Sequence, residues 1–79
     1  MDAWQETFTA NVRAARERAG LTQEDVGNAS GVGQAQYNRY ENGRVDPSIG
    51  VLIRIAAALG VTAAELLDGV EADAPQGAR

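Results

Sequence analysis

Amide and guanidinium side chains are concentrated in one short stretch of this sequence. On a helix from about Gln34 to Glu41, the face turned to solvent would carry Gln34, Ala35, Gln36, Asn38 and Arg39. A primary amide offers a donor and an acceptor to the edge of adenine, and arginine forms paired hydrogen bonds with guanine. The chemistry that these side chains favour is recognition of base edges. The plainer alternative is a solvated polar face.

The residues that most enzymes need are absent from the sequence. It contains no histidine, the commonest general base and metal ligand, and no cysteine for a disulfide or a thiolate site. The carboxylates are scattered, with no pair that would share a site. We therefore expect no enzymatic activity, no metal, no cofactor and no small-molecule substrate.

A second short helix is predicted directly before the polar one. Thr22 can cap it, and Asp25 three positions later completes a capping-box pattern. Val26 and Ala29 would point inward, while Gly27 leaves room for another backbone to come close. Two short helices joined by a tight turn are the pattern of a DNA-reading helix-turn-helix.

Glycines mark the turn and the end of this two-helix unit. Gly31 can take the positive φ that a tight corner needs. On the polar helix Tyr37 and Tyr40 would face inward, and Asn42-Gly43 would end it. The stretch 22–43 is thus predicted to present one polar face on a compact support.

Three further helices complete an all-α, five-helix prediction. An apolar stripe with an Asp2 cap predicts a helix over 3–19, and a Ser48 cap precedes another over 49–59. Thr62 opens a last helix to about residue 68, with Leu66 and Leu67 inward. We assign residues 1–68 to one domain and expect 69–79 to be a mobile tail.

Charge and composition limit the choice of partner. The 79 residues suit one small domain, and the net charge of −4 lowers the expected non-specific affinity for DNA. All seven basic residues are arginine, which suits contacts to guanine and phosphate. There is no apolar run long enough for a membrane span and no visible secretory signal, so we expect a cytoplasmic protein that does not enter a membrane.

The helix predicted over 49–59 is apolar on almost all sides, with Arg54 as its only charge. A chain of this size cannot surround such a helix completely. We therefore expect a homodimer whose interface includes Val51, Ile53, Ala57 and Leu67.

Several of these motifs occur in an order and spacing that resemble a known family. They are GLTQE at the start of the second helix, a small residue at Gly27, SGV in the turn, ENG after the third helix, Pro-Ser before the fourth, and LGVTAAELL at the end. From about Phe8 to Leu67 the chain looks like the helix-turn-helix of the Cro and lambda-repressor superfamily, often called XRE-type.

The resemblance implies roles for individual residues. It implies base reading by the start of the third helix and the turn that follows, here Gln34, Ala35, Gln36, Asn38 and Arg39. It implies phosphate contacts by Thr22 and Gln23 at the start of the second helix and by Asn42, Gly43 and Arg44 after the third. It also implies that Arg16 of the first helix pairs with Glu41 of the ENG motif, whereas Arg13 is expected to serve solubility.

The chain departs from the family pattern at a few positions. Gly33 stands where a Ser or Thr usually caps the third helix. Tyr37 replaces an aliphatic core residue, so we expect part of its ring to be exposed. Gly50 weakens the first turn of the fourth helix by up to roughly 1 kcal/mol.

Two classes of function fit these patterns. The first is a sequence-specific regulator of transcription that binds a two-fold DNA operator as a homodimer, like a small phage repressor or a restriction–modification controller protein. The alternative is an antitoxin or another protein–protein interaction module built on a helix-turn-helix scaffold, which the acidic balance favours.

Overall fold

The computed structural model describes residues 1–72, and these contain five helices and no strand. The helices are α1 (Ala3–Ala19), α2 (Gln23–Ser30), α3 (Gln34–Glu41), α4 (Ile49–Leu59) and α5 (Ala63–Leu66). The predicted all-α, five-helix fold is confirmed, and the bounds of α1, α3 and α4 match the predicted ones.

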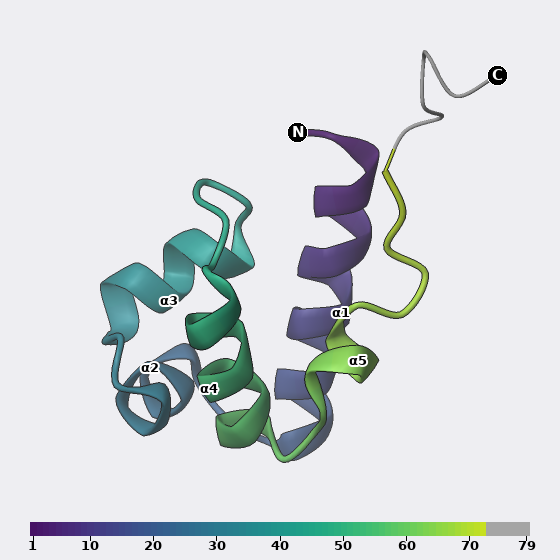
Figure 1. Ribbon diagram of the computed structural model, residues 1–79. Coiled ribbons are helices and arrows are strands. Elements are labelled where there is room, and N and C mark those ends of the chain that lie inside the picture. Colours follow the sequence, from purple (N-terminus) through teal and green to yellow (C-terminus); the bar gives the residue numbers. More distant parts are fainter. Residues whose placement is uncertain (73–79) are drawn as a thin grey trace, which may run out of the picture.

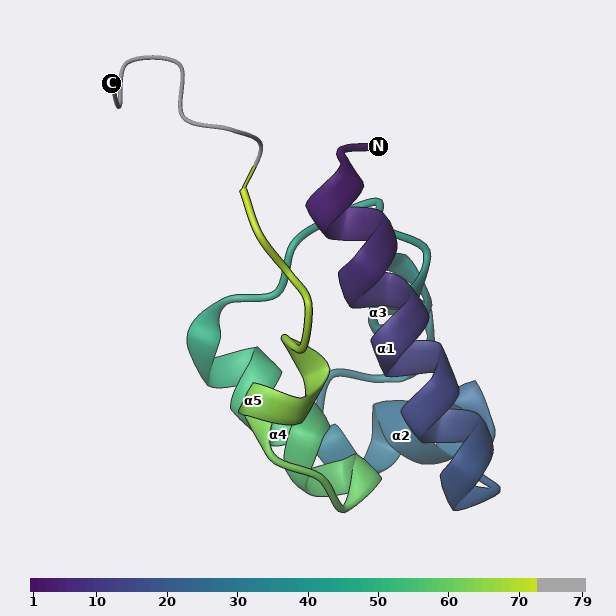
Figure 2. The same ribbon diagram turned by 90° about the vertical axis from the view of Figure 1, so that its right-hand side faces the viewer.

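The helices form one cluster around a small core. Helix α2 packs against both α3 and α4, while α1 contacts α3, α4 and α5 (Figure 1). The short α5 lies beside α1 and α4, as the view turned by 90° also shows (Figure 2). Helices α2 and α3 therefore form a helix-turn-helix whose back is supported by α1 and α4.

The core is built from apolar side chains of every helix. Its buried members are Phe8, Val12, Ala15, Val26, Tyr37, Tyr40, Leu52, Ile55, Ala56, Leu59 and Leu66. Their spacing along each helix places them on one face, so burial of that face orients the helix in the cluster.

Side-chain caps begin four of the helices where the sequence predicts them. The hydroxyls of Thr22, Ser48 and Thr62 each accept a hydrogen bond from the backbone N–H three positions later. Asp2 and Gln5 form a capping box at the start of α1. Each cap satisfies an N–H group that has no partner within the helix.

Three side chains lie differently from the prediction. Ala29 is exposed because the buried face of α2 runs through Val26, Gly27 and Ser30 instead. Tyr37 is fully buried, not partly exposed, since α3 packs against both α1 and α2. Leu67 is 42% exposed because α5 ends at Leu66, earlier than predicted, and the chain then turns.

The end of the chain is described only in part. Within residues 69–72, Val70 packs against the core. The remainder of the expected tail, residues 73–79, lies outside the described residues. In the described part of the chain, no helix has the length and apolar character needed to cross a membrane.

Candidate nucleic-acid interface

The joint between α2 and α3 depends on a close approach of two backbones. The Gly33 N–H donates to the Gly27 carbonyl at 2.9 Å. A Cβ at Gly27 would lie 2.5 Å from the carbonyl carbon of Gly33 and 2.6 Å from the nitrogen of Gln34, which no side chain tolerates. The predicted close approach at Gly27 is confirmed, and it sets the position of α3 on α2.

Gly33 takes a backbone conformation with positive φ at the start of α3. The family pattern, which has Ser or Thr at this position, did not suggest this role. Its φ of 87° lies where L-residues are strained, and it forms no side-chain cap. Gly33 therefore provides no capping hydroxyl. Its positive φ instead allows the chain to pass directly from the turn into α3.

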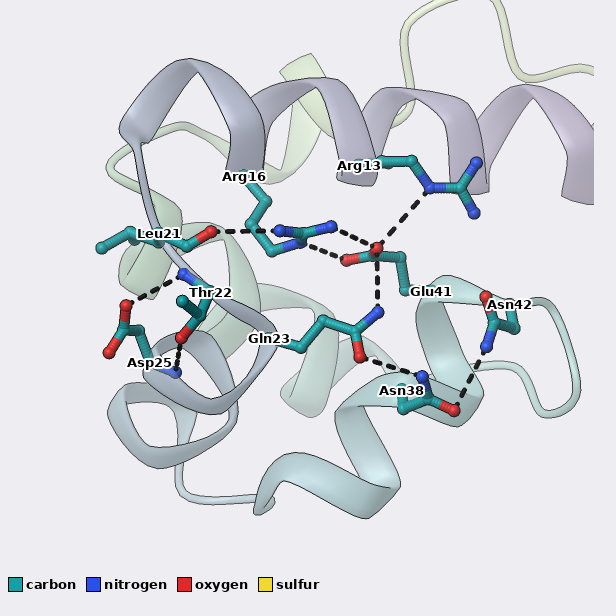
Figure 3. Close-up of polar contacts among 9 residues, drawn as sticks. All are labelled: Arg13, Arg16, Leu21, Thr22, Gln23, Asp25, Asn38, Glu41 and Asn42. Carbon is teal, nitrogen blue, oxygen red and sulfur yellow. Dashed lines mark hydrogen bonds and ion pairs between the residues drawn. The ribbon is translucent and has the colours of Figure 1, made fainter.

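A buried carboxylate fastens the other end of α3. Glu41 is only 1% exposed, and Arg16 of α1 holds both of its oxygens: Nε donates to Oε2 at 2.8 Å and Nη2 donates to Oε1 at 2.9 Å (Figure 3). Arg16 also donates through Nη1 to the Leu21 carbonyl at 3.1 Å. This bidentate geometry fixes both the distance and the angle between α1 and the end of α3.

The surroundings of Glu41 keep it ionised. Burial alone would oppose the charge, but the surrounding donors, of which Arg16 contributes most, outweigh it and lower the pKa of Glu41 to about 2. Glu41 is therefore a permanent hydrogen-bond acceptor at neutral pH.

A chain of amides extends from this carboxylate toward the surface. Gln23 Nε2 donates to Glu41 Oε1 at 3.2 Å, and Asn38 Nδ2 donates to Gln23 Oε1 at 2.9 Å. Asn42 Nδ2 in turn donates to Asn38 Oδ1 at 3.2 Å (Figure 3). The ion pair, the start of α2 and the outer side of α3 are thus one connected polar network.

Seven of the ten residues predicted to contact DNA line one shallow groove. They are Gln23, Gln34, Ala35, Asn38, Arg39, Asn42 and Arg44. Among the other three, Gln36 accepts a hydrogen bond from Arg39 Nη1 at 3.0 Å, next to the groove. The fold therefore brings residues from α2, α3 and the following loop to one concave surface.

The remaining two predicted phosphate contacts, Thr22 and Gly43, are chain neighbours of the groove residues Gln23, Asn42 and Arg44. The Thr22 N–H donates to the Asp25 carboxylate at 2.9 Å, so the cap occupies it, and that bond lowers the pKa of Asp25. Gly43 follows α3 with a φ of 73°. The loop after it is held to α1 by Gln5 Nε2, which donates to Asp46 Oδ1 at 2.9 Å.

Two features of the site were missed by the sequence analysis. Arg13 Nε lies 3.6 Å from Glu41 Oε1, so this half-exposed arginine is part of the ion-pair cluster. Its spacing of three residues from Arg16, on the same helix face, was the available signal. The pairing of Gln23 with Asn38 had no such signal in the sequence.

The outer face of α4 is apolar and exposed. Ile53 is 55% exposed and Ala57 is exposed one turn later, whereas Val51 is half-buried against the core. Ile49, which the sequence analysis did not single out, is 76% exposed one turn before Ile53. Ile49, Ile53 and Ala57 thus form one apolar stripe along α4.

Comparisons with known proteins point to one family. Residues 12–66 match the model of the family described as "Helix-turn-helix". The chain is 36% identical over 64 residues to the cryptic phage CTXphi transcriptional repressor RstR of Vibrio cholerae, covering 81% of this chain and 58% of that protein.

Two other curated relatives are similar over comparable lengths. An uncharacterized HTH-type transcriptional regulator, y4dJ of Sinorhizobium fredii, is 37% identical over 70 residues, covering 89% of this chain and 90% of that protein. The HTH-type transcriptional regulator DdrOP3 of Deinococcus deserti is 33% identical over 60 residues, covering 76% and 46%. The chain thus spans only about half the length of the first and third relatives.

Proposed function

Because the chain belongs to the helix-turn-helix family, we propose that it is a sequence-specific, DNA-binding regulator of transcription. It binds a two-fold operator as a homodimer, with α3 in the major groove, and it acts in the cytoplasm. The observation that carries this proposal is the groove lined by seven predicted contact residues. Two relatives are named as transcriptional regulators and one as a transcriptional repressor, which supports the same function.

Base recognition is proposed for the exposed side chains of α3. Gln34, Ala35 and Arg39 are exposed, and Arg39 keeps guanidinium donors beyond the one it gives to Gln36. Gln34 suits adenine, Arg39 suits guanine, and the methyl of Ala35 suits thymine. Gln36 accepts a hydrogen bond from Arg39, which lines the groove, and it is included in the proposed base-reading set.

Phosphate contacts are proposed for the start of α2 and for the loop after α3. Thr22 caps α2 and Gln23 is its first residue, where the helix dipole favours an anion, and Asn42, Gly43 and Arg44 follow α3. Few arginines lie here, so binding should depend only weakly on salt. Arg44→Ala should weaken binding to all sequences alike and lower the salt slope by about 1.

The decisive experiment is selection of bound sequences from random DNA. Wild type should select a two-fold site, while Gln34→Ala and Arg39→Ala should each lose the preference at one position, a cost of about 1–3 kcal/mol. Arg18→Ala, which removes an exposed arginine of α1 outside the groove, is the matched control and should leave the site unchanged. A specific site whose sequence ignores both α3 substitutions would overturn the assignment of α3.

The homodimer is proposed to form through the apolar stripe of α4, with Leu67 and Val51 at its edges. Dimerisation would place two α3 helices about 34 Å apart, in successive major grooves. Sedimentation should show a concentration-dependent dimer that Ile53→Ser disrupts. Val45→Ser removes an exposed apolar residue outside α4 and should leave the dimer intact. A wild type that stays monomeric at every concentration and on DNA contradicts this arrangement.

The acidic balance and the same exposed stripe favour a second candidate, a protein–protein module such as an antitoxin. A gel shift separates the two. Absence of any specific shift at low salt, with DNA from the chain's own upstream region, would favour the second candidate.

A further inference from the structure

Asn38 lies on the proposed reading helix, yet both polar atoms of its side chain are already engaged. Its Nδ2 donates to Gln23 Oε1 at 2.9 Å, and its Oδ1 accepts from Asn42 Nδ2 at 3.2 Å. The side chain is half-buried, unlike the exposed Gln34 and Arg39 on the same helix. A base edge would have to break one of these bonds, or share the amide by using the second N–H of Nδ2 and the second lone pair of Oδ1.

The carboxylate of Glu41 decides which way these amides point. An ionised carboxylate only accepts, so Gln23 must turn its NH2 group toward Glu41 and its carbonyl oxygen away. That oxygen needs a donor, which Asn38 supplies, and the oxygen of Asn38 is then left to accept from Asn42. Each amide orientation follows from the one before it, beginning at the charge.

Gln23 retains one N–H donor that could bind a ligand. A primary amide nitrogen has two N–H donors, and Glu41 takes only one from Gln23. Gln23 is the first residue of α2, lines the groove, and is held at both ends of its amide. A side chain held in this way binds a phosphate oxygen without the loss of rotamer freedom that a loose glutamine would suffer.

We infer that Asn38 is a positioning residue that aligns Gln23 for a phosphate contact, and that it does not read a base. This inference rests on the proposed DNA-binding function and replaces the expectation that Asn38 belongs to the base-reading set. The relay of Glu41, Gln23, Asn38 and Asn42 then links the Arg16 ion pair to the edge of the groove.

The first test needs no DNA. In proton–nitrogen NMR spectra of the 79-residue protein, Asn38→Ala should shift the side-chain NH2 signals of Gln23 and speed their hydrogen exchange. Asn28→Ala removes an exposed asparagine of α2 that makes no side-chain hydrogen bond within residues 1–72, and it should leave those signals in place. Unchanged Gln23 signals in the Asn38→Ala protein would overturn the relay.

The second test measures affinity for the site that wild type selects. Gln23→Ala and Asn38→Ala should each weaken binding roughly tenfold, as expected for one hydrogen bond to a charged group. The double variant should bind no more weakly than about the weaker of the two, since both remove the same contact. The bases preferred by Asn38→Ala should be those of wild type, as expected for a residue that does not read a base.

Two results would overturn the inference on DNA. A changed preference at one base position would make Asn38 a reader, and a double variant showing the product of the two single losses would make the residues independent. If wild type selects no sequence, the proposed function and the phosphate role of Gln23 both fail. The NMR measurement then still decides whether the relay exists in the free protein.

Discussion

Helices α3 and α4 pack against the same core, but different forces hold them there. Helix α3 buries Tyr37 and Tyr40 and is also tied at its end by the Glu41 ion pair, whereas α4 buries only aliphatic side chains. Aliphatic burial has no preferred direction, while a bidentate ion pair fixes an angle. In this fold, apolar burial holds both helices to the core, whereas the ion pair at Glu41 also fixes the orientation of one of them. That helix is α3, the proposed reading helix.

The strongest way to break this comparison is to remove Arg16. Arg16→Ala removes the bidentate partner of the buried Glu41 carboxylate and leaves it only Gln23 and the half-exposed Arg13 at 3.6 Å, so the free energy of unfolding at pH 7 should fall by about 3–5 kcal/mol. Urea titration measures it. Arg18→Ala, at an exposed position of the same helix, should change stability by less than about 0.5 kcal/mol. Equal stability of the two variants would mean that α3 is held by its tyrosines alone.

Acid should weaken the attachment of α3 selectively. The pKa of Glu41 is lowered from 4.5 to about 2 in the folded state, so its contribution is complete above about pH 5 and disappears as pH falls toward 2. The lowering corresponds to about 3 kcal/mol. Urea titrations of wild type and Glu41→Gln at several pH values isolate the contribution of Glu41 to the free energy of unfolding. Parallel losses of stability in the two proteins would show that Glu41 does not cause the acid sensitivity.

Two glycine-to-alanine substitutions should change the free energy of unfolding in opposite directions, one at the joint with α3 and one in α4. Gly27→Ala places a Cβ within 2.6 Å of the backbone where α3 begins, and it should lower the free energy of unfolding by about 1–3 kcal/mol. Gly50→Ala in α4 meets nothing nearer than Ser48 Oγ at 4.0 Å, and it should raise that free energy by about 0.5–1 kcal/mol. Thermal melts of the matched pair suffice, and a stabilised Gly27→Ala would contradict the close approach.

The smallest effect is expected at Tyr37, beside the polar network but outside it. Its hydroxyl is buried with no hydrogen-bond partner among the described residues, and burial raises its pKa. Tyr37→Phe should therefore change the free energy of unfolding by less than about 0.5 kcal/mol, or raise it slightly. If urea titration shows that the free energy of unfolding falls by more than about 1 kcal/mol, the hydroxyl belongs to the polar network. The attachment of α3 would then differ still more from that of α4.

Much of the fold followed from short stretches of sequence. The caps at Asp2, Thr22, Ser48 and Thr62 predicted where helices begin, and the apolar stripe over 3–19 predicted the core face of α1. The error at Leu67 came from the early end of α5 at Leu66, whereas the errors at Ala29 and Tyr37 concern burial. How deeply a side chain is buried depends on which helices pack over it, and spacing along a single helix does not contain that information.

The sequence by itself determined the five helices, the glycine joint and the set of polar residues that line the groove, because capping, backbone freedom and periodicity act over a few residues. The tertiary structure alone decided how those polar residues pair. Glu41 meets partners 18 and 25 positions away, and Asn38 meets Gln23 across 15 positions. Only the packing of α1, α2 and α3 sets those distances, and with them which amides are engaged and which remain for DNA.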